Sequence, residues 1–386
     1  MKICDITKFY AETSGGVKTY ITAKARYLME RKGWEHVLIV PGSEDQVIDS
    51  GQSRTYLIKG PLIPSYAPYR FLFNPWKVRA VLERERPDIV EIGSPYLVPW
   101  VTWLALSGLT WKPAVIGFYH ADFPGTYVRE FTRPLGETLS VGAERLAWWY
   151  ARALYNGCTL TLAASPHLVE TLTAHGIRRV RRVSLGVDLH LFHPARRDPD
   201  FKQRLGLQAD HTLLLYVGRL ATEKGISTLL DGFVRLPQER YRLLVVGDGP
   251  CRPDVETHAR THPTILYAGY ETNRERLATV YASSDLFITP SPQEPFGLTV
   301  LEAQASGLPV VGVRGGAIAN HVPAEAGALA RPSDATDLAV TIAQTAARDQ
   351  AAMRRAARLN AEERFDWNTV LEDLIRAYEE AVKSDE

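Results

Sequence analysis

The sequence predicts an α/β protein of two domains, each built on a parallel sheet covered by helices. Three observations support this prediction. The chain has 386 residues, a length typical of two domains. Short apolar runs alternate with amphipathic segments along most of it, as strands do with crossover helices. Polar and turn residues at 186–197 follow an expected strand and mark a break near the middle.

The alternation can be followed through the front half. Its short apolar runs are expected to be strands at residues 2–7, 36–41, 89–93, 114–119, 159–164 and 181–185. The amphipathic segments between them are expected to be helices at 17–32, 75–86, 139–156 and 166–175. This order predicts a Rossmann-like unit, with a parallel sheet and helices on its faces.

The rear half repeats the pattern. Strands are expected at 212–217, 241–246, 265–268, 286–289 and 310–313, and helices at 225–235, 252–262, 274–283 and 298–305. From residue 335 onward the chain is almost all helix, and a last helix at about 368–382 is expected to cross back to the front domain. We therefore expect an N-terminal domain of residues 1–190, completed by 367–386, and a C-terminal domain of residues 191–366.

Bulk composition excludes several classes of protein. A net charge of +1 gives no reason to expect nucleic acid binding. The three cysteines lie far apart without a CxxC pair, which predicts neither a disulfide framework nor a zinc site and fits a reducing cytoplasm. No apolar run reaches the roughly 20 residues that span a bilayer. The first residues are expected to form a strand and not a signal peptide.

Charge is divided unevenly between the two halves. Residues 1–195 carry roughly 23 Lys and Arg against 17 Asp and Glu, and the rest carries roughly 22 against 27. A basic front half indicates an anionic partner for that domain, and random drift in surface charge explains the division equally well.

The most informative stretch runs from Glu294 to Glu302. It places one carboxylate before an expected helix and the other one to two turns inside that helix. The N–H groups of Phe296, Gly297 and Leu298 are expected to face the space between the carboxylates, because the first N–H groups of a helix have no partner within it. Such donors bind hydroxyl and phosphate oxygens. The stretch therefore predicts a site for a polyhydroxylated anion such as a nucleotide sugar.

Two cations follow the first strand of the rear domain. Arg219 and Lys224 stand five residues apart in a strand–helix turn. Ligands of open parallel sheets bind at the carboxyl ends of the strands, so this pair is placed to clamp a diphosphate. A leaving nucleoside diphosphate gains negative charge, which would make the same cations catalytic. A solvated turn without a ligand is the alternative.

Two glycine turns end strands in the same way. Gly15 and Gly16 open the first helix, and Gly249 lies in the turn Gly247-Asp248-Gly249-Pro250 after the second rear strand. Glycine lets the backbone approach a phosphate closely, and it is also good turn chemistry. The front turn is not G-x-G-x-x-G, so the dinucleotide fingerprint is absent.

His120 ends the fourth front strand, with Asp122 as its nearest carboxylate. A histidine at that place can contact a sugar hydroxyl across an interdomain cleft, and a structural histidine is the alternative. The only D-x-D sequence, at 198–200, contains a proline and lies in the expected linker. A metal for the diphosphate is therefore not expected.

An aromatic and basic segment lies in the third expected front helix. It contains Arg145, Trp148, Trp149, Tyr150 and Arg152, and it is preceded by Arg129 and Arg133. Aromatic rings beside arginines suit a membrane surface or an acceptor. A helix whose aromatic residues pack in the core is an equally good interpretation.

Taken together and in this order, the motifs resemble the retaining glycosyltransferases of the GT-B fold, family 4. The resemblance rests on the Gly15-Gly16 turn, His120, the Arg219 and Lys224 pair, the Gly-Asp-Gly-Pro turn and the Glu-x7-Glu stretch with Phe-Gly after its first Glu. It covers essentially the whole chain. It implies two Rossmann-like domains facing each other across a cleft, with a C-terminal helix crossing back to the N-terminal domain.

The resemblance also implies roles for individual residues. Gly16, Arg219 and Lys224 would hold the diphosphate of the donor. Glu294 would accept a hydrogen bond from a hydroxyl of the transferred sugar, and His120 would touch that sugar near the reacting carbon. These two residues and the two cations are the expected catalytic groups.

The remaining expected contacts bind the substrate. Glu302 would hold the ribose hydroxyls, and the N–H groups of residues 296–298 would donate to the sugar or the phosphate. Tyr267 and Tyr270 belong to a segment that would line the base pocket. Gly15, Gly249 and Asp122 complete the expected set.

The implied reaction moves a hexose, glucose or mannose, from a nucleoside-diphosphate sugar such as UDP-glucose or GDP-mannose to a lipid or glycan acceptor. Anomeric configuration would be retained without metal, cofactor or protein nucleophile, since the leaving phosphate is thought to help deprotonate the acceptor. The expected location is the cytoplasm, with peripheral attachment to the inner face of the membrane left open. Two alternatives are a sugar-nucleotide epimerase of the same architecture and a non-catalytic subunit that only holds the nucleotide sugar.

Overall fold

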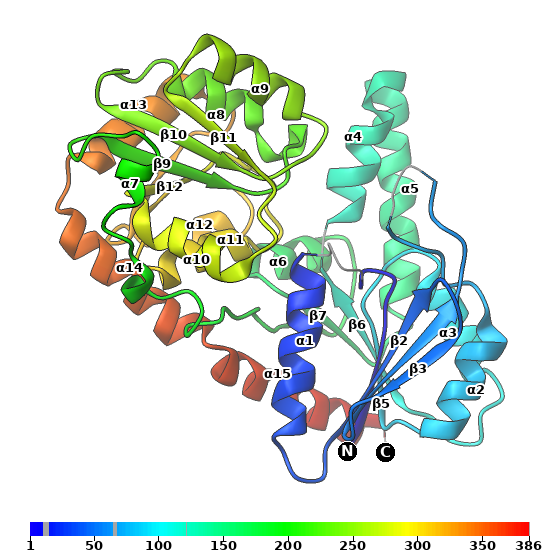
Figure 1. Ribbon diagram of the computed structural model, residues 1–386. Coiled ribbons are helices and arrows are strands. Elements are labelled where there is room, and N and C mark those ends of the chain that lie inside the picture. The colour runs from blue at the N-terminus through cyan, green and yellow to red at the C-terminus, as the bar shows by residue number, and fades with distance from the viewer. Residues whose placement is uncertain (11–14, 65–67, 121, 386) are drawn as a thin grey trace. The chain divides into compact units, whose positions relative to one another are not determined.

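The computed structural model describes residues 1–10, 15–64, 68–120 and 122–385 (Figure 1). The chain forms two compact units. Unit 1 consists of Met1–Ser184 with Val370–Glu386, and unit 2 consists of Leu185–Thr369. The last helix therefore returns to the first unit, as the sequence predicts.

Unit 1 is built on an eight-stranded sheet in the order β3-β4-β2-β1-β5-β6-β7-β8. Only β3 runs antiparallel to its neighbour. The chain passes from β1 to one side of the sheet and returns to place β5 on the other side, so a topological switch point lies between β1 and β5. The strands are β1 (Lys2–Ile6), β2 (Glu35–Gly42), β3 (Gln46–Asp49), β4 (Ser53–Lys59), β5 (Ile89–Ile92), β6 (Ala114–Tyr119), β7 (Leu160–Ala163) and β8 (Val180–Arg182).

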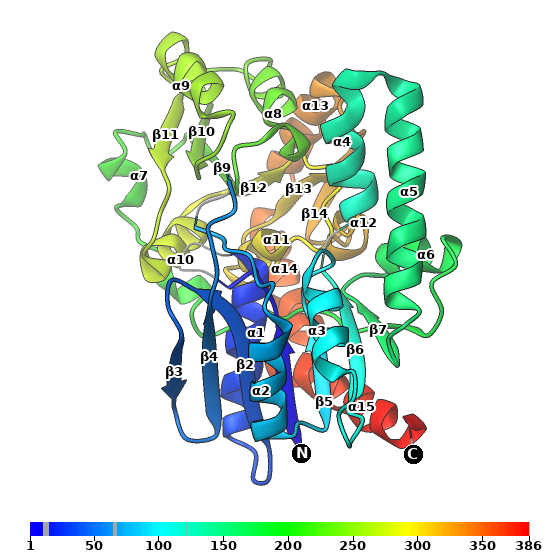
Figure 2. The ribbon, with the colours of Figure 1, turned by 90° about the vertical axis from the view of Figure 1, so that its right-hand side faces the viewer.

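Helices cover this sheet (Figures 1 and 2). They are α1 (Gly16–Met29), α2 (Pro75–Glu85), α3 (Val98–Leu106), a π-helical turn η1 (Phe123–Val128), α4 (Arg129–Thr132), a short turn η2 (Arg133–Leu135), α5 (Glu137–Tyr155), α6 (Pro166–Ala174) and the C-terminal α15 (Trp367–Asp385). The inner strands β2, β5 and β6 are almost wholly buried, as parallel strands covered on both faces require.

Unit 2 is built on a six-stranded parallel sheet in the order β11-β10-β9-β12-β13-β14. Its switch point lies between β9 and β12. The strands are β9 (Thr212–Val217), β10 (Tyr241–Val246), β11 (Ile265–Gly269), β12 (Leu286–Thr289), β13 (Val310–Val313) and β14 (Gly327–Ala330). The helices and short helical turns are η3 (Pro194–Arg196), α7 (Phe201–Arg204), η4 (Thr222–Lys224), α8 (Ile226–Phe233), α9 (Arg252–Thr261), α10 (Arg274–Ser283), α11 (Leu298–Ala305), α12 (Ile318–His321), α13 (Ala335–Ala346) and α14 (Gln350–Phe365).

Several elements of unit 1 depart from the sequence prediction, among them β3, β4, α3 and β8. The β3–β4 pair was not expected, because β3 is fully exposed at the sheet edge and carries no apolar alternation to detect. Helix α3 was not expected from the sequence; its Pro99 lies in the first helical turn, where proline is tolerated. The strand expected at 181–185 ends earlier, since Val183 and Leu185 are buried in a loop that follows β8.

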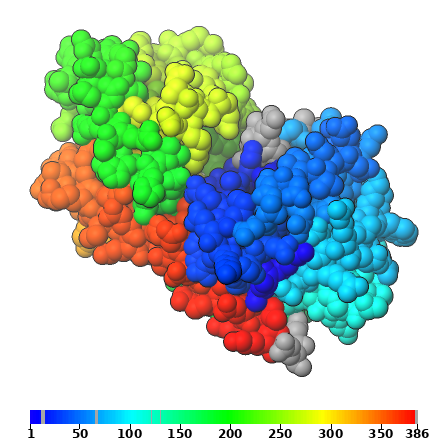
Figure 3. Space-filling model, turned by 60° about the horizontal axis from the view of Figure 1, so that its bottom comes forward, coloured from blue at the N-terminus to red at the C-terminus, as the bar shows by residue number. Residues whose placement is uncertain are grey.

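A buried ionic cluster joins α15 to the sheet of unit 1. The ammonium group of Lys24 lies 2.7 Å from an oxygen of Asp5 and 2.9 Å from an oxygen of Glu91. Lys24 also donates to the hydroxyl of Tyr378 on α15, at 2.9 Å, and Tyr378 donates in turn to Glu91. In the space-filling view the red C-terminal segment lies against the blue N-terminal part (Figure 3). The last helix is therefore held by hydrogen bonds between Tyr378 and a charged cluster that is almost fully buried.

We expect the stability of unit 1 to fall as the pH rises toward neutrality. Burial raises the pKa of the Glu91 carboxyl to about 7 although Lys24 opposes the shift, while in the unfolded chain the pKa is about 4.3. Between these values the folded protein binds more protons than the unfolded chain, so the free energy of unfolding decreases with rising pH. Urea titrations at about pH 5 and about pH 8 measure this slope.

The matched variant is Glu91→Gln, which cannot titrate. It should lose the decline that the unsubstituted protein shows over this range. Equal slopes in the two proteins would contradict the assignment of the decline to Glu91.

Candidate active site

The two charged groups that the sequence singled out in the rear half meet at the switch point of unit 2. Lys224 ends the short turn after β9, and Glu294 lies in the loop after β12. The ammonium group of Lys224 lies 2.6 Å from a carboxylate oxygen of Glu294, and both side chains are partly exposed. An ion pair thus spans the crevice where ligands of doubly wound sheets bind.

Glycines hold the Glu294 loop in place. Gly297 has a φ of +86°, and a Cβ there would come within 2.9 Å of Ile318. Gly316, in the turn after β13, has a φ of +51°, and a Cβ there would lie 2.5 Å from the carbonyl oxygen of Glu294. The same carbonyl accepts a hydrogen bond from the N–H of Ala317 at 2.8 Å. The loop is therefore braced by its neighbour, which fixes the direction of the Glu294 side chain.

The helix start beside Glu294 carries unused donors. The N–H groups of Phe296, Gly297 and Leu298 donate no hydrogen bond to any part of the chain that the structure describes. The ring of Phe296 is buried and packs 4.8 Å from the ring of His321, so this residue offers its backbone and not its side chain. The donors occupy the place predicted for them, at the first turn of α11.

Glu302 lies at the fifth position of α11 and is buried. One of its oxygens accepts from the hydroxyl of Tyr281 at 3.1 Å, and the other lies 3.0 Å from the guanidinium of Arg274. Burial raises the pKa of the Glu302 carboxyl, and Arg274 and Tyr281 oppose the shift. A ligand that binds Glu302 would share it with Arg274, whose side chain is half exposed.

The turns after β9 and β10 are packed against each other. Arg219 forms an ion pair with Glu223, and its side chain is half exposed. A Cβ on Gly247 would lie 1.9 Å from the carbonyl oxygen of Gly218, and a Cβ on Gly249 would lie 2.4 Å from that of Leu220. The sequence leaves two interpretations of the Gly249 turn open, close approach to a ligand and ordinary turn chemistry. The structure shows a close approach to the neighbouring turn, which by itself requires glycine at both positions.

The tyrosines expected in the base pocket lie within β11 and just after it. The hydroxyl of Tyr267, in β11, donates to the carbonyl of Gly247 at 3.1 Å, which ties β11 to the Gly247 turn. Tyr270 lies just past the strand and is exposed. Tyr267 thus lies in the middle of β11 and Tyr270 past its carboxyl end, and no contact in the structure assigns either of them a base.

The residues expected in the front half lie at the carboxyl edge of the sheet of unit 1. Gly15 caps α1, and a Cβ there would meet nothing within 4 Å, so packing does not demand this glycine. Gly16 is the first residue of α1. His120 follows β6 and packs between the rings of Phe118 and Tyr20. Residues 11–14, which precede the glycines, lie outside the described part.

The structure also gives the contacts of Asp122 and of the aromatic residues in α5. Asp122 accepts hydrogen bonds from the hydroxyl of Tyr119 and the N–H of Gly125, both at 3.1 Å, and so caps η1. Trp148 is buried and Tyr150 half-buried in the core of unit 1, whereas Trp149 is exposed. The interpretation that the aromatic residues pack in the core therefore holds for Trp148 and Tyr150 and fails for Trp149.

His120 carries an unusual nitrogen. Its Nε2 is buried and has no hydrogen-bond partner among the described residues. Burial lowers the pKa of its imidazole to about 3, with Lys24 adding to the effect, so the ring is neutral at physiological pH. A buried polar atom without a partner costs stability, which indicates that a ligand or water satisfies it.

We expect His120→Ala to reduce the turnover of the bound substrate without changing its pH dependence. The ring does not titrate near neutrality, so the profiles of kcat against pH for the variant and the unsubstituted protein should run parallel between about pH 6 and about pH 8. The loss should be about 10²-fold, the low end for a positioned polar group. An inflection near pH 6.5 that disappears in the variant would show a titrating histidine instead.

Sequence reasoning missed Arg274 and the glycine turn at 315–316. Arg274 opens α10 and reaches Glu302, which no sequence spacing reveals because the two lie on different helices. The paired glycines at 315–316 directly follow β13, and a Gly-Gly turn after a strand was a signal that could have been used. In the described residues, no group of three or more His, Cys, Asp or Glu is arranged to hold a metal ion, and no helix is long and apolar enough to cross a membrane.

Comparison with known proteins identifies the family. A model described as Glycosyltransferase Family 4 matches residues 14–191, and one described as Glycosyl transferases group 1 matches residues 211–348. A GDP-mannose-dependent alpha-(1-6)-phosphatidylinositol dimannoside mannosyltransferase of Mycobacterium tuberculosis is 31% identical over 97% of this chain and 95% of its own. The chain belongs to glycosyltransferase family 4. A GDP-mannose-dependent alpha-mannosyltransferase of Corynebacterium glutamicum is 29% identical to this glycosyltransferase over 82% of the chain and 73% of its own length.

Solved structures show the fold of this glycosyltransferase. A sucrose-phosphate synthase from Thermosynechococcus elongatus matches it with a TM-score of 0.79, at 21% identity and over 99% of both chains. Anabaena HepE in complex with UDP and glucose matches with a TM-score of 0.72, at 18% identity, over 98% of this chain and 99% of that one. The glycosyltransferase has the GT-B fold, and the family and fold together make it a hexosyltransferase.

Proposed function

We propose that this glycosyltransferase moves mannose from GDP-mannose to a lipid acceptor at the inner face of a membrane, with retention of anomeric configuration. The observation that carries the proposal is the Lys224–Glu294 pair beside the unused N–H groups of α11, at the switch point of unit 2. Two relatives, matched over most of this chain, bear names with GDP-mannose as donor, and the name of one includes a lipid acceptor. Glucose from UDP-glucose is the second candidate, since HepE carries UDP and glucose.

The charges of the site fit a sugar diphosphate. In the structure Lys224 and Arg219 are each paired with a carboxylate, Glu294 and Glu223. A bound diphosphate would compete for both cations, and Glu294 would then be released to accept a hydrogen bond from a sugar hydroxyl. The N–H groups at the start of α11 would donate to the same ligand. In this proposal Lys224 and Glu294 pair with each other in the absence of the donor, and each binds a different part of the donor when it is present.

The same groups would stabilise the departing nucleoside diphosphate. Negative charge grows on the leaving phosphate, and fixed cations and N–H dipoles favour that charge without rearranging. In this proposal Arg219 and Lys224 supply the positive charge, so no metal takes part. Nucleotide release should then proceed unchanged in excess EDTA, and a requirement for a divalent cation would contradict this part of the proposal.

Nucleotide release without acceptor tests the donor assignment. The donors are GDP-mannose, UDP-glucose, UDP-galactose, UDP-N-acetylglucosamine and ADP-glucose. We expect slow release of GDP from GDP-mannose and little release from the others. Faster release from UDP-glucose would replace mannose by glucose in the proposal.

Product analysis separates the two rival functions. A sugar-nucleotide epimerase would convert the donor to its epimer without any acceptor. A non-catalytic subunit would bind the donor in calorimetry and release no nucleotide with or without acceptor. Either result would overturn the proposed transfer reaction.

A further inference from the structure

The surface of unit 1 around α5 exposes an unusual number of large apolar side chains. We call this set the apolar ridge, and its members are Tyr127, Phe131, Leu135, Leu139, Leu146 and Trp149. Phe131 is 82% exposed and Trp149 is 60% exposed. They lie on one continuous segment from η1 through α4 and η2 to α5. Helices α4 and α5 stand side by side in Figure 2. An apolar surface of this kind marks an interaction site on a folded protein.

The ridge follows the solvent face of α5. Leu139, Leu146 and Trp149 recur at intervals of seven and three residues, so they share one side of the helix. Trp148, next in sequence, points into the core instead. A helix that packs on a core with one face normally has a polar face toward solvent. Helix α5 buries its inward face against the core of unit 1, and its solvent face also carries apolar side chains. A second partner is needed to cover it.

Positive charge accompanies the ridge. Arg145 and Arg152 lie on the same exposed face of α5, and no described carboxylate lies within 4.0 Å of either guanidinium. The acidic residues of this helix, Glu137 and Glu144, both pair with Arg129. The face therefore presents apolar side chains together with two arginines that have no carboxylate partner among the described residues.

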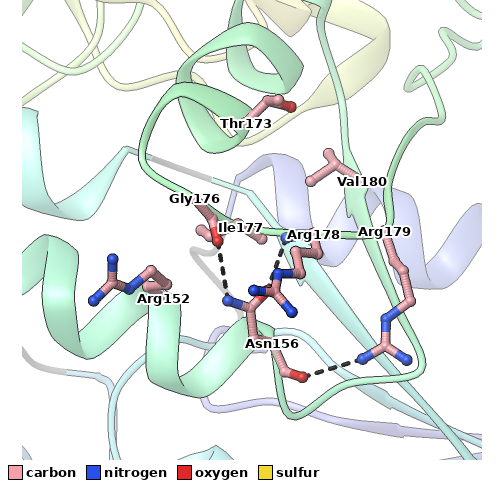
Figure 4. Close-up of a pocket in the computed structure, with 8 residues that line it drawn as sticks. All are labelled: Arg152, Asn156, Thr173, Gly176, Ile177, Arg178, Arg179 and Val180. Carbon is pink, nitrogen blue, oxygen red and sulfur yellow. Dashed lines mark hydrogen bonds between the residues drawn. The ribbon is translucent and has the colours of Figure 1, made fainter.

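A basic hollow continues this charge at the C-terminal end of α5. It has a volume of about 660 Å³ and is lined by Arg152, Arg178 and Arg179, with Asn156 between the helix and the loop before β8 (Figure 4). Asn156 holds that loop by accepting from the N–H of Arg178 at 2.7 Å and by accepting from the guanidinium of Arg179 at 3.1 Å. In the described part of the chain none of the three arginines has a carboxylate partner.

We propose that the apolar ridge inserts into the headgroup region of an anionic bilayer, with Arg145, Arg152 and the arginines of the hollow lying against lipid phosphates. Aromatic and aliphatic side chains on one face of a helix, with arginines beside them, are the composition of helices that lie in the membrane interface. Tryptophan and tyrosine favour the headgroup level, and each arginine near an anionic surface strengthens binding. The inference rests on the proposed function, because a lipid acceptor places the enzyme at such a surface.

Sedimentation with vesicles tests the ridge. The probes are vesicles of phosphatidylglycerol with phosphatidylcholine and vesicles of phosphatidylcholine alone, each at low and high salt. We expect binding to the anionic vesicles, weakened by salt, and little binding to the neutral ones. The double variant Leu146→Ser with Trp149→Ser should weaken binding at least tenfold. The double variant Arg152→Ala with Arg178→Ala should weaken binding about 25-fold, because each arginine is expected to contribute about fivefold.

Two variants outside the ridge serve as matched controls. Trp76→Ser removes another exposed tryptophan of unit 1, and Arg84→Ala removes another exposed arginine, both on α2. Neither should change vesicle binding. Equal losses in the control and ridge variants, or no loss in the ridge variants, would overturn the assignment of the surface.

Other occupants of the ridge give different results. If no vesicle binds at low salt, the proposal fails, and sedimentation velocity then shows whether the ridge joins two copies of the chain. Failure of the proposed function is measured separately by GDP release from GDP-mannose without vesicles. The ridge variants should keep that release unchanged, since none of their residues lies at the candidate active site.

Discussion

Lys224→Ala should lower the kcat/KM for nucleotide release by about 10²- to 10³-fold, because a fixed charge aimed at a developing anion typically contributes this much. The side chain lies at the mouth of the crevice after β9 and is partly exposed, so its loss leaves no cavity in the core. The protein should therefore fold normally, with an unchanged thermal transition. The effect should appear in kcat as well as in KM, since the charge is needed most when the phosphate departs.

The partner variant sharpens this prediction. Glu294→Gln keeps the shape of the side chain but removes the charge that pairs with Lys224 in the structure. If Glu294 binds the sugar, this variant should also lose activity, although Lys224 no longer has the Glu294 carboxylate to compete with the diphosphate. The control is Arg355→Ala, an exposed cation of α14 with no described ion pair. Near-normal turnover in the Lys224 variant, or an equal loss in the control, would contradict the site.

Lys24→Met should destabilise unit 1 by about 3–5 kcal/mol, the usual cost of removing one partner of a buried ion pair. Lys24 is fully buried, and its loss leaves Asp5 and Glu91 without their shared cation. The hydroxyl of Tyr378 also loses a donor, which loosens α15. Urea unfolding followed by tryptophan fluorescence measures the effect. The signal comes mainly from unit 1, since every tryptophan except Trp367 belongs to it.

A triple variant separates charge from packing. Lys24→Met with Asp5→Asn and Glu91→Gln removes the uncompensated charges and should recover part of the lost stability. If the triple variant is as unstable as the single one, the cost comes from side-chain packing and not from buried charge. The single variant should also lose more stability at about pH 8 than at about pH 5, where Glu91 holds a proton.

Much of the fold could be predicted because the strands and helices are strongly patterned. The strands at 212–217, 241–246, 286–289 and 310–313 and the helices at 274–283 and 298–305 lie where expected. Each is a short apolar run or an amphipathic segment bounded by turn residues, so one local signal defines it. The exposed edge strand β3 and the evenly apolar helix α3 lack such contrast and were missed.

Single residues of the site could be predicted from the sequence, but the contacts between residues of different elements could not. Glu294 and Lys224 were marked by their places after parallel strands, and the fold brings such places together. Arg274 could not be found, because its partner Glu302 lies on another helix and only the packing of α10 against α11 joins them. The buried cluster around Lys24 was also invisible, since its members come from β1, α1, β5 and α15.

The measurement that tests the central claim most directly is transfer of radiolabelled mannose from GDP-mannose into membrane lipids extracted with organic solvent. The unsubstituted protein should label the lipid fraction, the Lys224→Ala variant should not, and the anomeric configuration of the transferred sugar should match that of the donor. No label in lipid or glycan from any of the five donors, or equal labelling by the Lys224→Ala variant, would contradict the account.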